Sequence, residues 1–135
     1  MAKSKNRVSE FTSYIYIKNE LSTLGWNIKN PSRNSDGQVY TQQECLNHEE
    51  IQKQLINKKP EYVVKISEDN FYIIEAKGSI DDIDKAFEEA LDYADLINKS
   101  KIIKGCVISG VAGNDDDGYI VKSAFLEKGR FKTIN

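Results

Sequence analysis

The stretch that decides the fold is KPEYVVKISEDNFYIIEAKG, residues 59–78. Two short apolar runs flank a polar turn, which is the pattern of a β-hairpin. The second run ends in Glu75-Ala76-Lys77, so a carboxylate and an ammonium point to the same side of an otherwise apolar strand. Burying such a pair is costly unless it has a role. The hairpin is therefore the predicted centre of the fold and the first candidate site.

Glu61 opens the first apolar run, directly after Pro60. Because side chains alternate along a strand, Glu61 and Glu75 share a face only if directly opposed residues have numbers with an even sum. This condition predicts a three-residue loop or a bulge within residues 67–70, and it disfavours a two-residue turn. In that register, two carboxylates and a lysine converge at one end of the hairpin, which suits a divalent cation and phosphoryl transfer.

Upstream, the sequence predicts a helix from an N-cap at Ser9 to about Leu24, ended by Gly25. Its inward stripe at helical spacing comprises Phe11, Tyr14, Ile17, Leu21 and Leu24. Glu10 falls near the middle of this stripe and Glu20 at its edge. Glu10 is therefore either a helix-start carboxylate favoured by the helix dipole or a member of the site. A short strand at residues 26–29 and a polar helix at about residues 42–57 are expected to follow.

Downstream, residues 80–98 give the clearest helix, with an apolar side (Ile83, Phe87, Ala90, Ala94, Ile97) and an acidic side (Asp81, Asp82, Glu88, Asp92, Asp95). Residues 104–110 are almost continuously apolar and predict a central strand. A polar turn, a strand at residues 119–125 and a final segment at residues 131–134 follow. That final segment is read as an edge strand or the start of a further element. The aspartates of the turn resemble a calcium loop that lacks its remaining ligands.

Length and charge limit the class of protein. The 135 residues are expected to form one domain, residues 1–135, with a flexible basic tail at residues 1–8. Residues 34–98 carry fifteen Asp and Glu against six Lys and Arg, whereas both ends of the chain are basic. This distribution fits an enzyme that acts on a polyanion, and it also fits ordinary solvated helix faces.

Cysteine usage and hydropathy exclude several classes. Cys45 and Cys106 are isolated and histidines are not clustered, so neither a zinc site nor a disulfide framework is predicted. The longest apolar run is far short of the ~18 residues that a membrane span needs, and the first residues lack the apolar segment of a secretion signal. We therefore expect a soluble cytoplasmic protein with no membrane partner.

The predicted order, helix, three strands, helix, strand (αβββαβ), with Pro60-Glu61 on one central strand and Glu75-Ala76-Lys77 on the next, resembles the PD-(D/E)XK nuclease superfamily. Within it, the segments LSTLGWN (residues 21–27) and EALDYA (residues 89–94), together with Glu10, resemble the amino-terminal nuclease domains of type I and type IIG restriction enzymes. The resemblance covers nearly the whole chain. It implies an α/β restriction-endonuclease-like core with a mixed central sheet flanked by helices, belonging to a larger restriction enzyme.

The resemblance also implies roles for particular residues. Glu61, Glu75 and the backbone carbonyl of Ala76 would hold Mg²⁺, for which Mn²⁺ can substitute. Lys77 would orient the attacking water or stabilise charge on phosphorus, and Glu10 would be a further catalytic acid. Oxygen ligands at a strand end suit Mg²⁺ on independent physical grounds.

The sequence departs from the family pattern at two positions. The first acid is usually Asp, and Glu61 is one methylene longer. On the second helix, related nucleases often carry a Gln four residues before a Tyr, where this chain has Glu89 and Tyr93. These two residues share a helix flank, so both are supporting candidates for the site. An ionised carboxylate at position 89 cannot donate a hydrogen bond, so its contacts must differ from those of a Gln.

The leading hypothesis is a Mg²⁺-dependent DNA endonuclease domain of a restriction-modification system. Its expected partners are double-stranded DNA and the methyltransferase, motor or specificity modules of the parent enzyme, because phosphate contacts alone carry no sequence information. A repair or recombination nuclease, such as a junction resolvase, is an alternative within enzymes. The alternatives from other classes are a non-catalytic DNA-binding or assembly module with a degenerate site and a purely structural domain.

Overall fold

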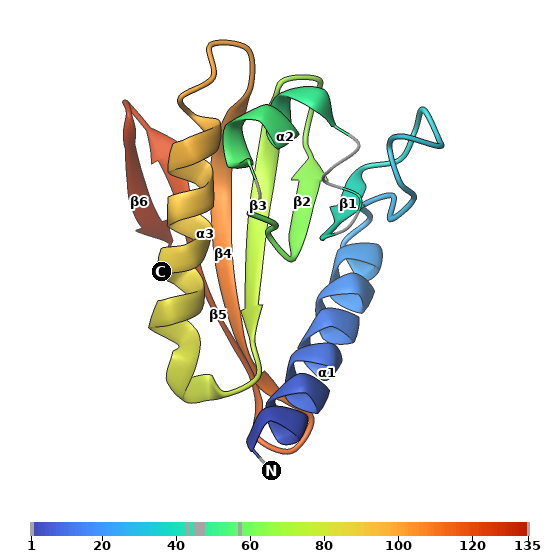
Figure 1. Ribbon diagram of the computed structural model, residues 1–135, viewed down its shortest axis with the longest axis vertical. Coiled ribbons are helices and arrows are strands. Elements are labelled where there is room, and N and C mark those ends of the chain that lie inside the picture. Colours follow the sequence, from blue (N-terminus) through green and yellow to red (C-terminus); the bar gives the residue numbers. More distant parts are fainter. Residues whose placement is uncertain (1, 43, 45–47, 57, 135) are drawn as a thin grey trace.

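The computed structural model describes the backbone of residues 2–42, 44, 48–56 and 58–134, and the side chains of these residues except 2–11 and 13. The elements, in chain order, are α1 (Ala2–Thr23), β1 (Val39–Thr41), α2 (Glu49–Leu55), β2 (Tyr62–Lys65), β3 (Asn70–Lys77), the 3-10 helix η2 (Ile80–Asp82), α3 (Ile83–Ile97), β4 (Lys104–Asn114), β5 (Gly118–Glu127) and β6 (Arg130–Ile134) (Figure 1). The protein is thus a mixed α/β fold.

Six strands form one sheet in the order β1-β2-β3-β4-β5-β6. The β3–β4 pair is parallel and connected through α3, whereas the other neighbouring pairs are antiparallel. The predicted mixed sheet flanked by helices is confirmed. The element order contains more than the predicted αβββαβ, because α2 stands between the first two strands and β5 and β6 extend the sheet beyond β4.

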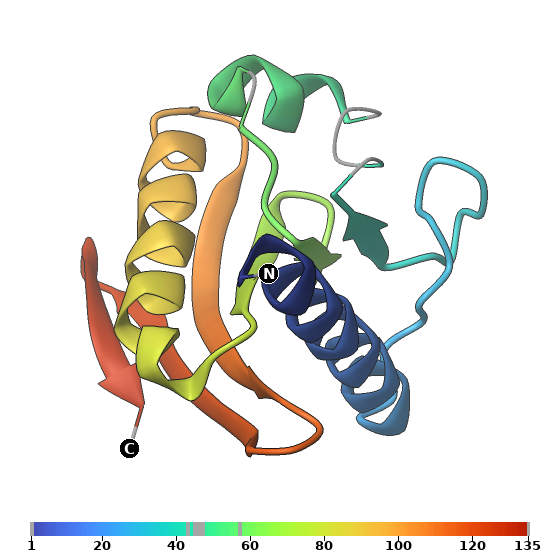
Figure 2. The same cartoon turned by 60° about the horizontal axis from the view of Figure 1, so that its bottom comes forward.

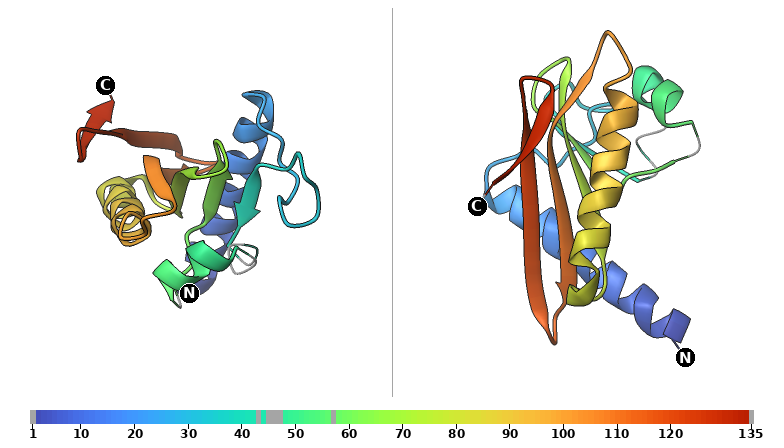
Figure 3. Two further views of the ribbon diagram at one scale, coloured as in Figure 1. Left: turned by 90° about the horizontal axis from the view of Figure 1, so that it is seen from above. Right: turned by 90° about the vertical axis from the view of Figure 1, so that its left-hand side faces the viewer.

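Two clusters of buried side chains lie on the two faces of the sheet. Helices α2 and α3 cover one face, where Phe71 and Ile73 of β3 are buried. Helix α1 covers part of the other face, where the alternating residues Ile74 and Ala76 are buried. The view along the sheet in Figure 3 shows α1 and α3 on opposite sides of it, and Figure 2 shows α2 beside the carboxyl end of α3.

The hairpin has the predicted register. Tyr62 lies opposite Ile74 and Lys65 lies opposite Phe71, so the numbers of opposed residues have an even sum. The Ile66 N–H donates to the carbonyl of Asn70 at 2.9 Å, and the three residues between them close the loop. The prediction of a three-residue loop is confirmed, and it brings residue 61 opposite residue 75.

Helix α1 differs from its prediction at its amino end and in the direction of Leu24, whereas its carboxyl end lies where Gly25 predicted it. It begins at Ala2 rather than at Ser9, so residues 2–8 belong to the helix and do not form the expected tail. Ile17 and Leu21 are buried as predicted, but Leu24 is 72% exposed. Leu24 falls in the turn after the last helical residue, where the helical stripe no longer sets its direction. Gly25 follows with a positive φ of 98°, the left-handed conformation typical of a helix stop.

The first strand is not at residues 26–29, where the sequence predicted it. That segment instead lies beside residues 38–39, with the Gln38 N–H donating to the carbonyl of Asn27 at 2.8 Å, and the strand is β1. The predicted polar helix at residues 42–57 is also shorter. It begins after His48, whose Nδ1 accepts a hydrogen bond from the Ile51 N–H, and residues 43, 45–47 and 57 lie outside the described residues.

The second half of the chain follows its prediction more closely. The predicted helix at residues 80–98 is η2 followed by α3, with Ala90, Ala94 and Ile97 fully buried and the five acids of the predicted acidic side exposed. The strand β4 is central and β6 is an edge strand, as expected. Gly110 of β4 faces α3 so closely that a Cβ there would overlap the backbone of Ala86 and Phe87. The helix therefore packs directly on the strand.

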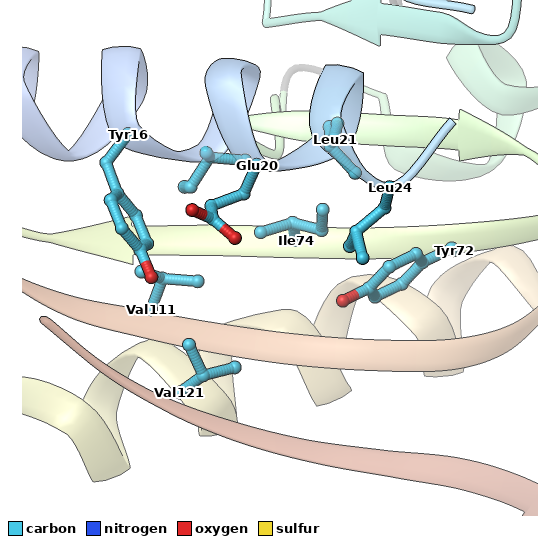
Figure 4. A pocket seen from close by; sticks show the side chains of 9 residues that line it. Tyr16, Glu20, Leu21, Leu24, Tyr72, Ile74, Val111 and Val121 are labelled. Carbon is cyan, nitrogen blue, oxygen red and sulfur yellow. The ribbon is translucent and has the colours of Figure 1, made fainter. Parts of the chain in front are cut away.

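The face that carries α1 has a pocket of about 140 Å³ between the helix and strands β3 to β5. Apolar side chains line most of it, and Glu20 directs its carboxylate over it (Figure 4). The predicted position of Glu20 at the edge of the helical stripe accounts for this placement. Within the described ranges, no helix combines the length and apolarity that a membrane crossing requires.

Candidate active site

Five of the side chains predicted for a site lie together on the face of the sheet that carries α3. Glu75 and Lys77 are two residues apart on β3 and point to the same face as the buried Ile73. Glu61 stands one residue before β2, where Tyr62 lies opposite Ile74, and its backbone N–H donates to Oε1 of Glu75 at 3.2 Å. Glu89 and Tyr93 reach the same region from α3, where a spacing of four residues places them on one flank. The hairpin supplies one wall of this site and α3 supplies the other.

The carboxyl group of Glu75 is buried, with only 6% of the residue exposed. Its Oε1 accepts hydrogen bonds from the backbone N–H of Glu61 at 3.2 Å and of Ala76 at 3.3 Å. Loss of solvent, together with the neighbouring Glu61 and Glu89 carboxylates, raises the pKa of Glu75 to about 8, although the Lys77 ammonium opposes this. A carboxyl group in this environment keeps its proton at neutral pH unless further positive charge arrives.

Lys77 forms an ion pair with Glu89. The distance from Nζ to Oε2 is 2.8 Å, and the side chains are 21% and 34% exposed. Sequence analysis placed both residues in the site but did not predict that they contact each other. The pair is formed between the end of β3 and the middle of α3, so it also connects the sheet with the helix.

Tyr93 completes the wall formed by α3. Its hydroxyl hydrogen-bonds to the Glu75 carboxyl, and burial and the nearby carboxylates raise the pKa of the phenol. The hydroxyl is therefore a neutral donor over the whole physiological range. Tyr93 thus contacts Glu75 and Glu89 contacts Lys77, the two residues of β3 that were predicted for the site.

Two further residues, Ala76 and Glu10, were predicted for the site. The side chain of Ala76 is on the opposite face of β3, among the residues packed against α1, so only its backbone can contribute to the site. The side chain of Glu10 lies outside the described side chains, and its backbone is part of α1. The amino end of α1 lies at the same end of the molecule as the carboxyl end of β3 (Figure 1).

Asn114 is a residue that the sequence analysis missed. Its side-chain nitrogen donates to the carbonyl of Gly78 at 3.0 Å, and its Oδ1 accepts from the N–H groups of Asp116 and Asp117. Asn114 therefore ties the β4–β5 turn to the residue that follows Lys77. An Asn that precedes an aspartate-rich turn is a signal for such a cap. Asp117 of this turn accepts a hydrogen bond from the Asn114 side chain at 3.2 Å, and Asp115 accepts one from the Tyr119 hydroxyl of β5 at 2.7 Å.

The side chains of the site bear on whether it could hold Mg²⁺. Among the described residues, no group of three or more His, Cys, Asp or Glu side chains is arranged to hold a metal ion. Mg²⁺, however, is usually bound by one or two carboxylates together with waters and substrate phosphates. Glu61, Glu75 and the carbonyl of Ala76 offer oxygen atoms only, and the carboxylates of Glu61 and Glu89 lie close enough to Glu75 to raise its pKa. The residues fit a divalent cation in donor type.

Comparisons with protein-family models, with curated proteins and with solved structures found no match to this chain.

Proposed function

We propose that this chain is a Mg²⁺-dependent DNA endonuclease domain of the PD-(D/E)XK type, acting within a restriction-modification system. The observation that supports the proposal is the register of the hairpin, which puts Glu75 and Lys77 on one face of β3 and brings Glu61 within hydrogen-bond distance of Glu75. Duplex DNA is the proposed substrate. The remaining modules of a restriction enzyme are the proposed partners, because phosphate contacts alone carry no sequence information.

The site residues would divide the work of hydrolysis. Mg²⁺, when bound, would polarise the phosphodiester and lower the pKa of a bound water. Glu61 and Glu75 would hold the cation, with the carbonyl of Ala76 as a further oxygen ligand. Lys77 would hold the attacking water or the charge that develops on the phosphoryl oxygens. Tyr93 donates to the Glu75 carboxyl and would fix its orientation.

The buried Glu75 has to lose its proton before it can serve as an oxygen ligand. With a pKa of about 8, Glu75 would exchange its proton for the positive charge of a bound cation. That charge would also reduce the repulsion between Glu75 and the carboxylates of Glu61 and Glu89. The acid excess of the site, which is otherwise costly, supports the proposal in this way.

The test is the substitution Lys77→Ala. It is expected to abolish Mg²⁺-dependent nicking of supercoiled plasmid DNA while leaving the circular-dichroism spectrum unchanged. Lys85→Ala is the matched control, because it removes an exposed ammonium from the first turn of α3 at the same cost in charge. Cleavage by Lys77→Ala at the rate of the wild-type protein would refute the assigned role.

A non-catalytic DNA-binding or assembly module is the second candidate. Two features favour it: Lys77 is paired with Glu89, and burial and the neighbouring carboxylates raise the pKa of Glu75 to about 8, which disfavours its charged form. Calorimetric titration with Mg²⁺ and Mn²⁺ separates the two functions. Heat of binding at millimolar metal supports the nuclease, and its absence supports the module. A repair nuclease would be indicated by cleavage of branched but not linear duplexes.

A further inference from the structure

The ion pair of Lys77 has a consequence for any anionic ligand of this site. The ammonium is in contact with Glu89 at 2.8 Å, and both side chains are largely shielded from solvent. An ammonium has three N–H donors but a single positive charge, and a carboxylate and a phosphate oxygen are chemically similar partners for it. A phosphate that approaches Lys77 therefore competes with a carboxylate that is already in place.

Glu89 also acts on the rest of the site. Its carboxylate is close enough to raise the pKa of Glu75, so its negative charge is felt at both predicted positions of β3. Glu88, the neighbouring residue on α3, is exposed. Glu88 and Glu89 thus carry the same charge on the same helix, and it is Glu89 that forms the ion pair with Lys77.

We propose that Glu89 is a positioning residue that acts through Lys77. Its carboxylate is an internal anion that occupies the ammonium in the resting protein, and a phosphodiester of the substrate has to displace it. The inference rests on the proposed function in one respect, which is that the anion is a DNA phosphate. It goes beyond that function because the Glu89 carboxylate would make DNA bind more weakly than it would to a site without this competing anion.

The experiment is a double-mutant cycle read by DNA affinity. Glu89→Gln keeps the shape of the side chain and an acceptor oxygen for Lys77, but it removes the competing charge. Binding of a short fluorescent duplex is measured by anisotropy in Ca²⁺, a cation that takes the same oxygen ligands. Affinity is expected to rise on the order of fivefold, a change that corresponds to the free energy of a partly shielded ion pair. In a Lys77→Met background the same substitution is expected to change affinity little.

Glu88→Gln is the matched control, since it removes the same charge from the same turn of α3. It is expected to change affinity by less than Glu89→Gln and by the same amount with and without Lys77. Thermal unfolding of every variant shows whether it is folded, and Lys77→Gln replaces Lys77→Met if the latter is not. Under Mg²⁺, the substitution Glu89→Gln is expected to lower KM more than it changes kcat.

The possible outcomes separate this inference from the proposed function. A gain equal to that of Glu88→Gln, or one that persists without Lys77, shows general charge repulsion and overturns the role of Glu89, even if the protein cuts DNA. A gain that depends on Lys77, in a protein that does not nick plasmid, supports the internal anion and refutes the nuclease. Absence of DNA binding by all variants overturns both.

Discussion

At the scale of the residue, Glu75 links the electrostatics of the site to stability. Its ordinary pKa is 4.5, and its pKa in the folded protein is about 8 because of burial and the carboxylates of Glu61 and Glu89. Below about pH 4.5 the group is protonated in both the folded and the unfolded chain. Between these two values only the unfolded chain releases the proton. The stability present at low pH is therefore lost as pH rises towards the folded pKa.

The direction of this pH dependence of stability gives a prediction for Glu75→Gln in the absence of metal. The amide cannot ionise, so the substitution is expected to remove most of the loss of stability between about pH 5 and about pH 8. The free energy of unfolding at the higher pH should exceed that of the wild-type protein by on the order of 3 kcal/mol. Urea denaturation at both pH values measures it. Glu88→Gln is the control, and an equal pH dependence of Glu75→Gln and wild type would contradict the prediction.

Part of the site could be predicted because it depends on residues that are close together in the sequence. The alternation of a strand and the parity of the hairpin are enough to put Glu61, Glu75 and Lys77 on one face, and helical spacing is enough to put Glu89 beside Tyr93. Which of these meet could not be predicted. The contact between Lys77 and Glu89 depends on how far α3 is shifted along β3, and that shift is set by packing at positions such as Gly110.

At the scale of the element, the position of α3 on β4 depends on Gly110. A methyl group there would overlap the backbone nitrogen of Phe87 and lie 2.8 Å from the carbonyl carbon of Ala86. Backbone cannot rotate away as a side chain can, so the helix would have to lift from the strand. The residues of α3 that contact the site would move with it.

We therefore predict that Gly110→Ala destabilises the protein by about 2–3 kcal/mol and weakens any activity that depends on α3. Chemical denaturation measures the first effect and plasmid nicking the second. Gly105→Ala is the matched comparison on the same strand. Its methyl would meet Cδ1 of Ile73 at 2.7 Å, and that flexible side-chain end can shift, so a smaller loss is expected. Equal losses for the two substitutions would contradict the argument.

The elements that sequence analysis misplaced are those whose partners are distant in the chain. Residues 26–29 alternate like a strand, and Trp26 and Ile28 do pack against the core under α1, but their backbone does not join a ladder. β1 is only three residues long, and it is a strand because Val39 to Thr41 pair with β2. The periodicity of apolar residues indicates which side chains are buried, whereas a strand also needs the edge of a neighbouring strand with which its backbone can pair.

At the scale of the whole molecule, the candidate site lies between two layers. Its acids come from the hairpin at Glu61 and Glu75 and from α3 at Glu89, so the charge of a cation held by Glu61 and Glu75 would act on both layers. The pocket beneath α1 is on the other face and shares none of these residues. A ligand of the candidate site is therefore expected to stabilise the packing of α3 on the sheet, and through it the folded state as a whole.

Mg²⁺ is accordingly expected to raise the unfolding temperature, and to raise it more at about pH 8 than at about pH 6. Binding requires the Glu75 carboxylate, and the fraction of ionised Glu75 grows as pH approaches its pKa of about 8. At about ten times the dissociation constant, the ion would add about 1.4 kcal/mol, or roughly 4 °C. Differential scanning calorimetry with Mg²⁺ or EDTA measures the shift. Glu61→Gln should reduce it and Glu88→Gln should keep it, whereas a shift independent of pH would show that the ion binds elsewhere.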